Sequence, residues 1–183
     1  CQMRCVWCDT EHAFYDGDWM ALDAVVERVR SFGCPLVEVT GGEPLLQPDV
    51  HPLMTRLCDL GLEVLLETGG GLDIAGVDPR VRRIVDVKCP ASGESQNNRW
   101  RNLDDLRSSD ELKFVVAGKD DYDWAKRVIT ERGLAGRCPI HLSPVHGAVD
   151  LEALAGWILA DRLPVRLTLQ LHKQIWGADA KGV

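Results

Sequence analysis

Short apolar runs alternate with amphipathic helical patterns along this chain, and this alternation limits the available folds most. Six runs rich in Val, Leu or Ile predict strands at residues 36–39, 63–67, 84–87, 111–116, 139–142 and 165–170. Apolar residues spaced three and four apart predict helices at 22–32, 50–60, 122–132 and 151–160, with Gly33, Gly61 and Gly133 as helix stops. Because parallel strands need crossover connections, the order predicts an α/β fold with a mostly parallel sheet, closed or partly closed into a barrel.

Polar and glycine-rich segments follow most of the predicted strands, at residues 40–44, 67–71, 88–90, 143–146 and 171–173. In parallel α/β folds the functional site lies at the carboxyl ends of the strands, so we expect these segments to form it. The run Thr40-Gly41-Gly42-Glu43-Pro44 suits a close approach between backbone and ligand, because glycine has no side chain in the way. For this run alone, an ordinary tight turn is an equally good interpretation.

Length and charge favour one domain that acts on a small molecule. A chain of 183 residues with 45% apolar composition predicts a single domain over residues 1–183. Lys and Arg number 21 against 28 Asp and Glu, a net charge of -7, which argues against nucleic acid as the partner. We find neither a signal peptide nor an apolar run near the roughly 20 residues that a membrane span needs. The sequence therefore predicts a cytoplasmic protein with no membrane partner.

The seven cysteines contain one tight group, Cys1, Cys5 and Cys8, at the start of the chain. An odd number with this clustering is not typical of a disulfide scaffold. Because the chain opens with Cys on its densest motif, we expect it to be N-terminally truncated. The remaining cysteines are predicted to be small packing residues, and three tryptophans in helical patterns are predicted to lie in the core: Cys34, Cys58, Cys89, Cys138, Trp19, Trp124 and Trp157.

The spacing C-x-x-x-C-x-x-C lets one loop wrap three thiolates around a metal centre. A structural zinc site is the alternative, but zinc in such sites takes four ligands, typically with a second Cys or His pair. No second pair is visible, although His12 is a candidate fourth ligand. Three thiolates leave one iron of a 4Fe-4S cluster open, which suits a cluster that must bind something else.

With Trp7 before the third cysteine and the Gly41-Gly42-Glu43-Pro44 run, the sequence resembles the radical S-adenosylmethionine (SAM) superfamily. The resemblance implies that the open iron binds the amino and carboxylate groups of SAM, and that the reduced cluster cleaves SAM to a 5'-deoxyadenosyl radical. It further implies an electron donor, flavodoxin-like or other. The Gly-Gly-Glu-Pro turn would help to hold the methionine amino group.

A narrower resemblance, to the 7-carboxy-7-deazaguanine synthase family, covers nearly the whole chain. It rests on Cys8-Asp9-Thr10, Val39 to Pro44, Glu67-Thr68-Gly69, Asp86 to Pro90 and Leu169-Gln170-Leu171-His172-Lys173. It implies conversion of 6-carboxy-5,6,7,8-tetrahydropterin to 7-carboxy-7-deazaguanine in queuosine and other deazapurine biosynthesis. It also implies a homodimer, a magnesium ion beside the substrate carboxylate, and a partial barrel with a compact β6/α3-like core whose N-terminal strand is missing here.

The resemblance assigns a role to each matching position and assigns no acid or base. Cys1, Cys5 and Cys8 would bind the 4Fe-4S cluster, and Thr10 would bind magnesium. The SAM pocket would be lined by Trp7, Cys8, Asp9, Gly42, Glu43, Asp86, Lys88 and Ser143. The pterin would contact Thr40, Glu67 and His172.

Two rival functions stay open at this point. Another small radical enzyme, notably an activase that abstracts hydrogen from a glycine of a partner protein, would share the cysteine spacing. A metal-binding module without catalysis is the non-enzyme alternative. The first rival predicts a surface for a protein chain in place of a pterin pocket, and the second predicts zinc.

Overall fold

The computed structural model describes residues 1–15, 17–178 and 180. Its centre is a sheet with strand order β1-β2-β3-β4-β5-β6, in which every neighbouring pair is parallel. The strands are β1 (Leu36–Val39), β2 (Glu63–Thr68), β3 (Arg82–Asp86), β4 (Glu111–Val116), β5 (Ile140–Pro144) and β6 (Arg166–Leu167). Within the described residues β1 does not pair with β6, so the sheet is open. The predicted α/β fold with a partial barrel is confirmed.

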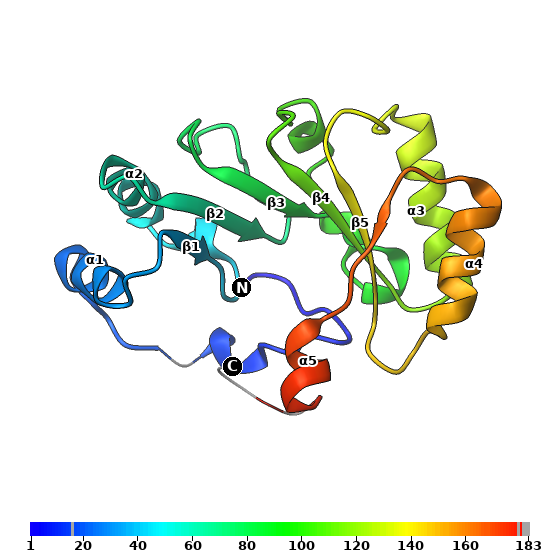
Figure 1. The fold of residues 1–183 in the computed structure, drawn as a ribbon, viewed down its shortest axis with the longest axis horizontal. Helices are drawn as coiled ribbons and strands as arrows, with labels where there is room; N and C mark the ends of the chain where they lie inside the picture. Colours follow the sequence, from blue (N-terminus) through cyan, green and yellow to red (C-terminus); the bar gives the residue numbers. More distant parts are fainter. Residues whose placement is uncertain (16, 179, 181–183) are drawn as a thin grey trace.

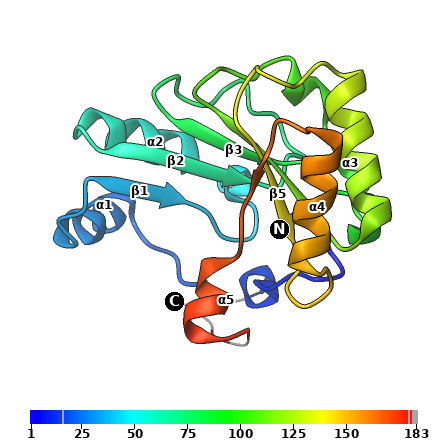
Figure 2. The same ribbon diagram turned by 45° about the vertical axis from the view of Figure 1, so that its right-hand side comes forward.

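Four long helices cover one side of this sheet: α1 (Leu22–Ser31), α2 (Val50–Asp59), α3 (Lys119–Glu131) and α4 (Leu151–Asp161). All four were predicted. Gly33, Gly61 and Gly133 follow three of them with φ of 63°, 80° and 58°, a left-handed conformation that glycine adopts without strain. Figure 1 shows α1 and α2 beside the first strands and α3 and α4 beside the last, while Figure 2 shows α3 and α4 side by side.

A fifth helix, α5 (Leu171–Trp176), and five 3-10 turns complete the described chain: η1 (Glu11–Phe14), η2 (Pro44–Leu46), η3 (Pro90–Ser92), η4 (Ser95–Asn97) and η5 (Trp100–Leu103). No α-helix lies between β2 and β3 or between β3 and β4 in the described chain. With α5 included, the described chain holds five α-helices, more than the three implied by the β6/α3-like core. Loops and 3-10 turns therefore connect the strands at the middle of the sheet, and the polar segments 67–71 and 88–90 lie at the start of these connections.

The last strand is shorter than predicted. Residues 165–170 read as a strand, but β6 contains only Arg166 and Leu167, both exposed. Thr168 still donates its N–H to the Leu142 carbonyl at 3.0 Å, after which the chain leaves the sheet for α5. The apolar pattern therefore continued past the point where the backbone pairing stops.

Buried apolar side chains form two clusters on the helix side of the sheet. The smaller one joins β2 to α1 and α2 and includes Val26, Met54 and Leu66. The larger one joins β3, β4 and β5 to α3 and α4 and includes Phe114 and Leu142. Residues between the buried ones point to the other face of the sheet, which carries Glu67 on β2, Asp86 on β3 and Lys113 on β4. These side chains make that face available for a polar ligand.

Two packing predictions need correction. Trp124 and Trp157 pack against the larger cluster as expected, but Trp19 lies before α1 and is 91% exposed. Cys89 and Cys138 are buried and Cys58 is half-buried, whereas Cys34 lies exposed in the turn before β1. Both misplaced residues lie in connections, where a helical or packing pattern has no neighbouring element to bury it. Among the described residues, no helix is long and apolar enough to cross a bilayer.

Candidate functional site

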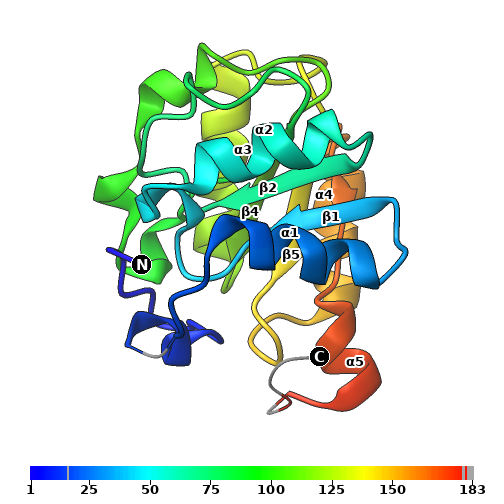
Figure 3. The ribbon, with the colours of Figure 1, turned by 90° about the vertical axis from the view of Figure 1, so that its left-hand side faces the viewer.

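The cysteine loop, residues 1–10, lies at the carboxyl ends of β2 and β3. Met3 anchors it, with only 2% of its surface exposed. Gly71, just beyond β2, lies so close that an added Cβ would be 2.5 Å from Met3 Cε. The Val6 N–H also donates to the Ser92 carbonyl at 3.0 Å, in the segment that follows β3. Figures 1 and 3 show this N-terminal segment and α5 on the side of the sheet away from α2 and α3.

All three thiols of the cysteine loop are free and half-buried. The Cys8 N–H donates to the Cys5 carbonyl at 3.1 Å, which closes a tight turn between those two cysteines. Within residues 1–15, 17–178 and 180, no three His, Cys, Asp or Glu side chains converge on a point that could hold one metal ion. A cluster needs a different arrangement, because its thiolates bind different irons. Three separate thiols on one loop fit that requirement.

A half-buried cation and a buried carboxylate lie beside the cysteine loop. Lys88 Nζ donates to Asp86 Oδ2 at 2.7 Å. Burial alone would lower the pKa of Lys88, but the Asp86 carboxylate and the Cys5 thiol raise it above its ordinary value. Burial raises the pKa of the Cys5 thiol, and the Lys88 ammonium opposes part of that rise. Lys88 is therefore a permanent positive charge next to the thiols.

The second oxygen of Asp86 has no partner. Asp86 is 8% exposed, and its Oδ1 is buried without a hydrogen bond to any described residue. Buried carboxylate oxygens are normally satisfied, so an orphaned one at a strand end indicates a ligand that donates to it. SAM carries an ammonium and ribose hydroxyls, and either group fits this acceptor.

The Gly41-Gly42 turn meets the first cysteine directly. A Cβ on Gly42 would lie 3.1 Å from both Cys1 Cβ and Cys1 N, closer than side chains normally pack. Gly41 has φ of 135°, a conformation that residues with side chains rarely adopt. The glycines after β1 thus allow the cysteine loop to approach the backbone of this turn closely.

The carboxylate of Glu43 connects two strand ends. It is 4% exposed and accepts from the Gly69 N–H at 2.8 Å and the Leu45 N–H at 3.1 Å. Thr68 Oγ1 lies 2.9 Å from both of its oxygens. Glu43 therefore joins the turn after β1 to the end of β2, and any contact with a cofactor would add to these internal bonds.

Asp9 links the cysteine loop to the C-terminal motif. Its Oδ2 accepts from Gln170 Nε2 at 2.8 Å and lies 3.1 Å from Lys173 Nζ and 3.9 Å from His172 Nε2. Burial alone would raise the pKa of Asp9, but the hydrogen bond and charge of Lys173 lower it below its ordinary value. Two segments from opposite ends of the described chain thus form one side of the site.

The remaining predicted residues lie around this centre. Trp7 is half-buried, and Thr10 Oγ1 is 3.7 Å from Cys8 Sγ. Glu67 is half-buried near the end of β2 and accepts from Lys113 Nζ at 2.6 Å. Thr40 follows β1 and is exposed, and Ser143 is 2% exposed at the end of β5. Among the described residues, neither Thr40 nor Ser143 makes a hydrogen bond to the cysteine loop.

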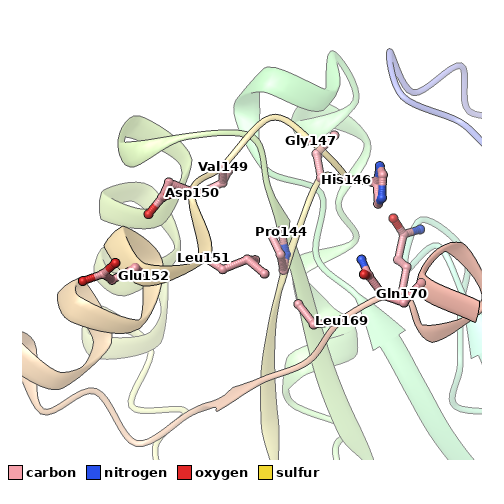
Figure 4. Close-up of a pocket in the computed structure, with 11 residues that line it drawn as sticks. Pro144, His146, Gly147, Val149, Asp150, Leu151, Glu152, Leu169 and Gln170 are labelled. Carbon is pink, nitrogen blue, oxygen red and sulfur yellow. The ribbon is translucent and has the colours of Figure 1, made fainter. Parts of the chain in front are cut away.

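A cavity of about 390 Å³ opens beyond the end of β5 (Figure 4). It runs from Pro144 and His146 to Leu169 and Gln170, and Gln170 also bonds Asp9 of the cysteine loop. It thus borders the predicted segment 143–146 and the start of the C-terminal motif at Leu169 and Gln170.

The sequence interpretation missed three residues that support the site. Glu94 accepts the Arg4 N–H, Asn98 brackets the backbone of Lys88 with two hydrogen bonds, and Lys113 pairs with Glu67. Glu94 and Asn98 lie a few residues beyond the predicted segment 88–90. The alternation of β4 was the only signal for Lys113, since it places a cation on the polar face of a central strand.

Comparison with known proteins places this site in a family. The model of the Radical SAM superfamily matches residues 1–91. The crystal structure of SuiB from Streptococcus suis has a TM-score of 0.58 and 10% identity, over 93% of this chain and 47% of that one, which shows a shared fold.

Several similar curated proteins carry the name 7-carboxy-7-deazaguanine synthase. The protein from Chlorobaculum tepidum is 47% identical over all of this chain and 84% of its own length. Those from Koribacter versatilis and Methanospirillum hungatei are 43% and 38% identical, over 100% and 96% of this chain and 88% and 73% of their own lengths. The chain is therefore a radical SAM enzyme that belongs to the 7-carboxy-7-deazaguanine synthase family.

Proposed function

We propose that this chain converts 6-carboxy-5,6,7,8-tetrahydropterin to 7-carboxy-7-deazaguanine for queuosine or another deazapurine. The observation that carries the proposal is the extent of the similarity. The superfamily model ends at residue 91, whereas the relatives from Chlorobaculum tepidum and Koribacter versatilis match the whole chain, including the half that contains Lys113, Ser143 and His172. The strand ends outside the superfamily match are where a substrate-specific pocket is expected.

The cofactor residues divide into two groups. Cys1, Cys5 and Cys8 would hold the 4Fe-4S cluster, with one iron left for SAM. The cysteine loop, the turn after β1 and the ends of β3 and β5 would hold SAM, through Trp7, Cys8, Asp9, Gly42, Glu43, Asp86, Lys88 and Ser143. When bound, the cluster and SAM supply a 5'-deoxyadenosyl radical that abstracts hydrogen from the substrate.

Two observations support this placement. The unpaired Asp86 Oδ1 offers a hydrogen-bond acceptor, and Gly42 leaves the space beside Cys1 without a side chain.

Three polar residues would orient the pterin. Glu67 offers a carboxylate that can accept from ring N–H groups, and Lys113 holds it through one oxygen. Burial alone would lower the pKa of Lys113, but Glu67 raises it above its ordinary value, so the Lys113 ammonium stays charged. Thr40 and His172 would add hydrogen bonds from β1 and α5. Fixing the substrate in this way matters, since small misplacements of the reacting carbon are costly.

Magnesium would complete the substrate site. Thr10 follows the third cysteine by two residues and has a hydroxyl without a cap bond to the next turn. Magnesium takes octahedral oxygen ligands and often few from protein, so one hydroxyl together with the substrate carboxylate and water is sufficient.

The test is product yield with the full-length protein, reconstituted anaerobically and supplied with 6-carboxytetrahydropterin. A synthase that returns hydrogen to the product radical regenerates SAM, so deazaguanine product should exceed the 5'-deoxyadenosine released. One deoxyadenosine per product would indicate consumption of SAM. No product, with deoxyadenosine formed only when a glycine-containing partner is added, would favour the activase.

The remaining parts of the proposal concern partners and location. A homodimer, a flavodoxin-like or other reductant, and a cytoplasmic location stay predictions. Sedimentation of the reconstituted protein tests the dimer. Iron and zinc analysis after reconstitution separates the enzyme from a zinc-binding module.

A further inference from the structure

Glu94 is a buried carboxylate that lies against the cysteine loop and has no assigned role. It follows η3 and is 9% exposed. Its Oε1 accepts the backbone N–H of Arg4 at 2.7 Å, and its Oε2 accepts from the side chain of Asn97. Arg4 directly precedes Cys5 and therefore lies between the first two cysteines.

A second bond from the same segment reaches the loop on the other side of Cys5. The Ser92 carbonyl accepts the Val6 N–H at 3.0 Å. The residues before and after Cys5 are thus both held by the segment 92–94, while Cys5 itself makes no bond to that segment. Cys5 is free to bind iron, and its backbone position is fixed from both sides.

The segment 92–94 is itself rigid. Ser92 Oγ donates to the Cys89 carbonyl at 2.6 Å and accepts from the Glu94 N–H at 3.1 Å. Gly93 has φ of 78°, which turns the chain so that Ser92 and Glu94 can both face the loop. Because Cys89 lies in the larger core cluster, this anchor connects the cysteine loop to that cluster.

We propose that Glu94 is a positioning residue whose reach holds the cysteine loop in the conformation that binds the cluster. The inference rests on the proposed ligation by Cys1, Cys5 and Cys8. The proposal gives a reason for the bond between a buried carboxylate and a backbone N–H. A loop with three ligands must hold them close together before iron binds, and the bond to the Arg4 N–H fixes the first half of that loop. Residues that orient metal ligands commonly affect metal affinity strongly.

The experiment compares three substitutions of Glu94 in the full-length protein. Glu94→Gln keeps the length and an oxygen for Arg4, Glu94→Asp keeps the charge but shortens the reach, and Glu94→Ala removes both. Glu131→Ala, an exposed glutamate of α3, is the matched control. Iron per chain, loss of iron to a chelator and the electron-spin-resonance spectrum are measured after anaerobic reconstitution.

We expect Glu94→Gln and the control to hold iron like the parent. Glu94→Asp should hold less iron and release it faster, with an altered spectrum, and Glu94→Ala should lose most of it. If Glu94→Ala does not fold, the contrast between Gln and Asp still decides. Equal iron, equal release and equal spectra in Glu94→Asp and the parent would overturn the proposal.

The ligation itself is checked in the same series. Cys5→Ala must lose iron for the three-cysteine assignment to stand. If it does, while Glu94→Asp and Glu94→Ala match the parent, only the inference about Glu94 fails. If the parent binds no iron, the proposed function fails first.

Discussion

The two parts of the sheet differ in how much apolar surface they bury. The part built on β3 to β5 with α3 and α4 contains 17 buried apolar residues in one cluster, against eight around β1, β2, α1 and α2. The cysteine loop contacts both parts, through Gly42 after β1 and through the segment 92–94 after β3. The site is held by polar bonds such as those of Glu43 and Asp9. Apolar burial therefore supports the scaffold, while directional hydrogen bonds shape the site.

The largest expected effect concerns the cysteine loop. Cys5→Ala should abolish cluster binding, because a thiolate ligand is lost. Iron per chain after reconstitution measures it. Replacing any one of the four other cysteines by Ala should leave iron unchanged: Cys34, Cys58, Cys89 and Cys138. Full iron retention in Cys5→Ala would show that the cysteine loop is not the cluster site.

The next effect tests the scaffold. Phe114 is fully buried in the larger cluster, and Phe114→Ala should lower the free energy of unfolding by about 3–5 kcal/mol through lost burial and a cavity. Urea denaturation of the protein without its iron–sulfur cluster measures this free energy of unfolding. Leu159→Ala is the control, since Leu159 is 77% exposed and should change stability by no more than about 0.5 kcal/mol. Similar losses in both variants would mean that burial here does not support the scaffold.

A smaller effect is expected at the turn after β1. Glu43→Ala should weaken SAM binding by about 1.5–3 kcal/mol, because it removes a charged hydrogen-bonding group and leaves buried N–H groups unpaired. Gly42→Val should also obstruct binding by crowding Cys1. Titration calorimetry on the reconstituted protein measures both, and each variant should keep its iron.

The control for this turn is Gly156→Val. Gly156 lies in α4, and an added Cβ there has no atom within 4 Å. Its SAM affinity should equal that of the parent. If Gly42→Val and Glu43→Ala also bind SAM normally, the turn only connects the ends of β1 and β2 and does not bind SAM.

The smallest effect is confined to magnesium. Thr10→Ala should keep the cluster, SAM cleavage and stability, but lose the stimulation of product formation by magnesium, while Thr10→Ser keeps most of it. Product formation with and without added magnesium is the measurement. If Thr10→Ala responds to magnesium as the parent does, Thr10 acts only at the start of η1.

The sequence predicted the elements whose signals are local. Residues 111–114 alternate between polar and apolar and begin β4, and the helix before Gly133 ended where the glycine predicted. It overextended β6, since apolar alternation through residue 170 does not reveal where backbone pairing stops. It missed α5, which has only six residues and so little periodicity to read.

The site was predictable in outline but not in its supports. The strand-end rule located the turns at residues 40–44, 67–71 and 88–90, and these three do meet the cysteine loop. The partners of Glu43 and Glu94 could not be predicted, because they depend on how separate loops fold against each other. Lys113 and Glu67 are 46 residues apart, and only the register of three strands brings them together.

The bond between Asp9 and Gln170 has a consequence for the order of folding. It joins residues 161 positions apart, so one of the longest loops in the chain must close before Asp9 is held. Closing such a loop costs conformational entropy that only a nearly complete fold can offset, and contacts of this kind form late. Asp9 is synthesised long before Gln170, so the cysteine loop gains this support only after β6 has been synthesised.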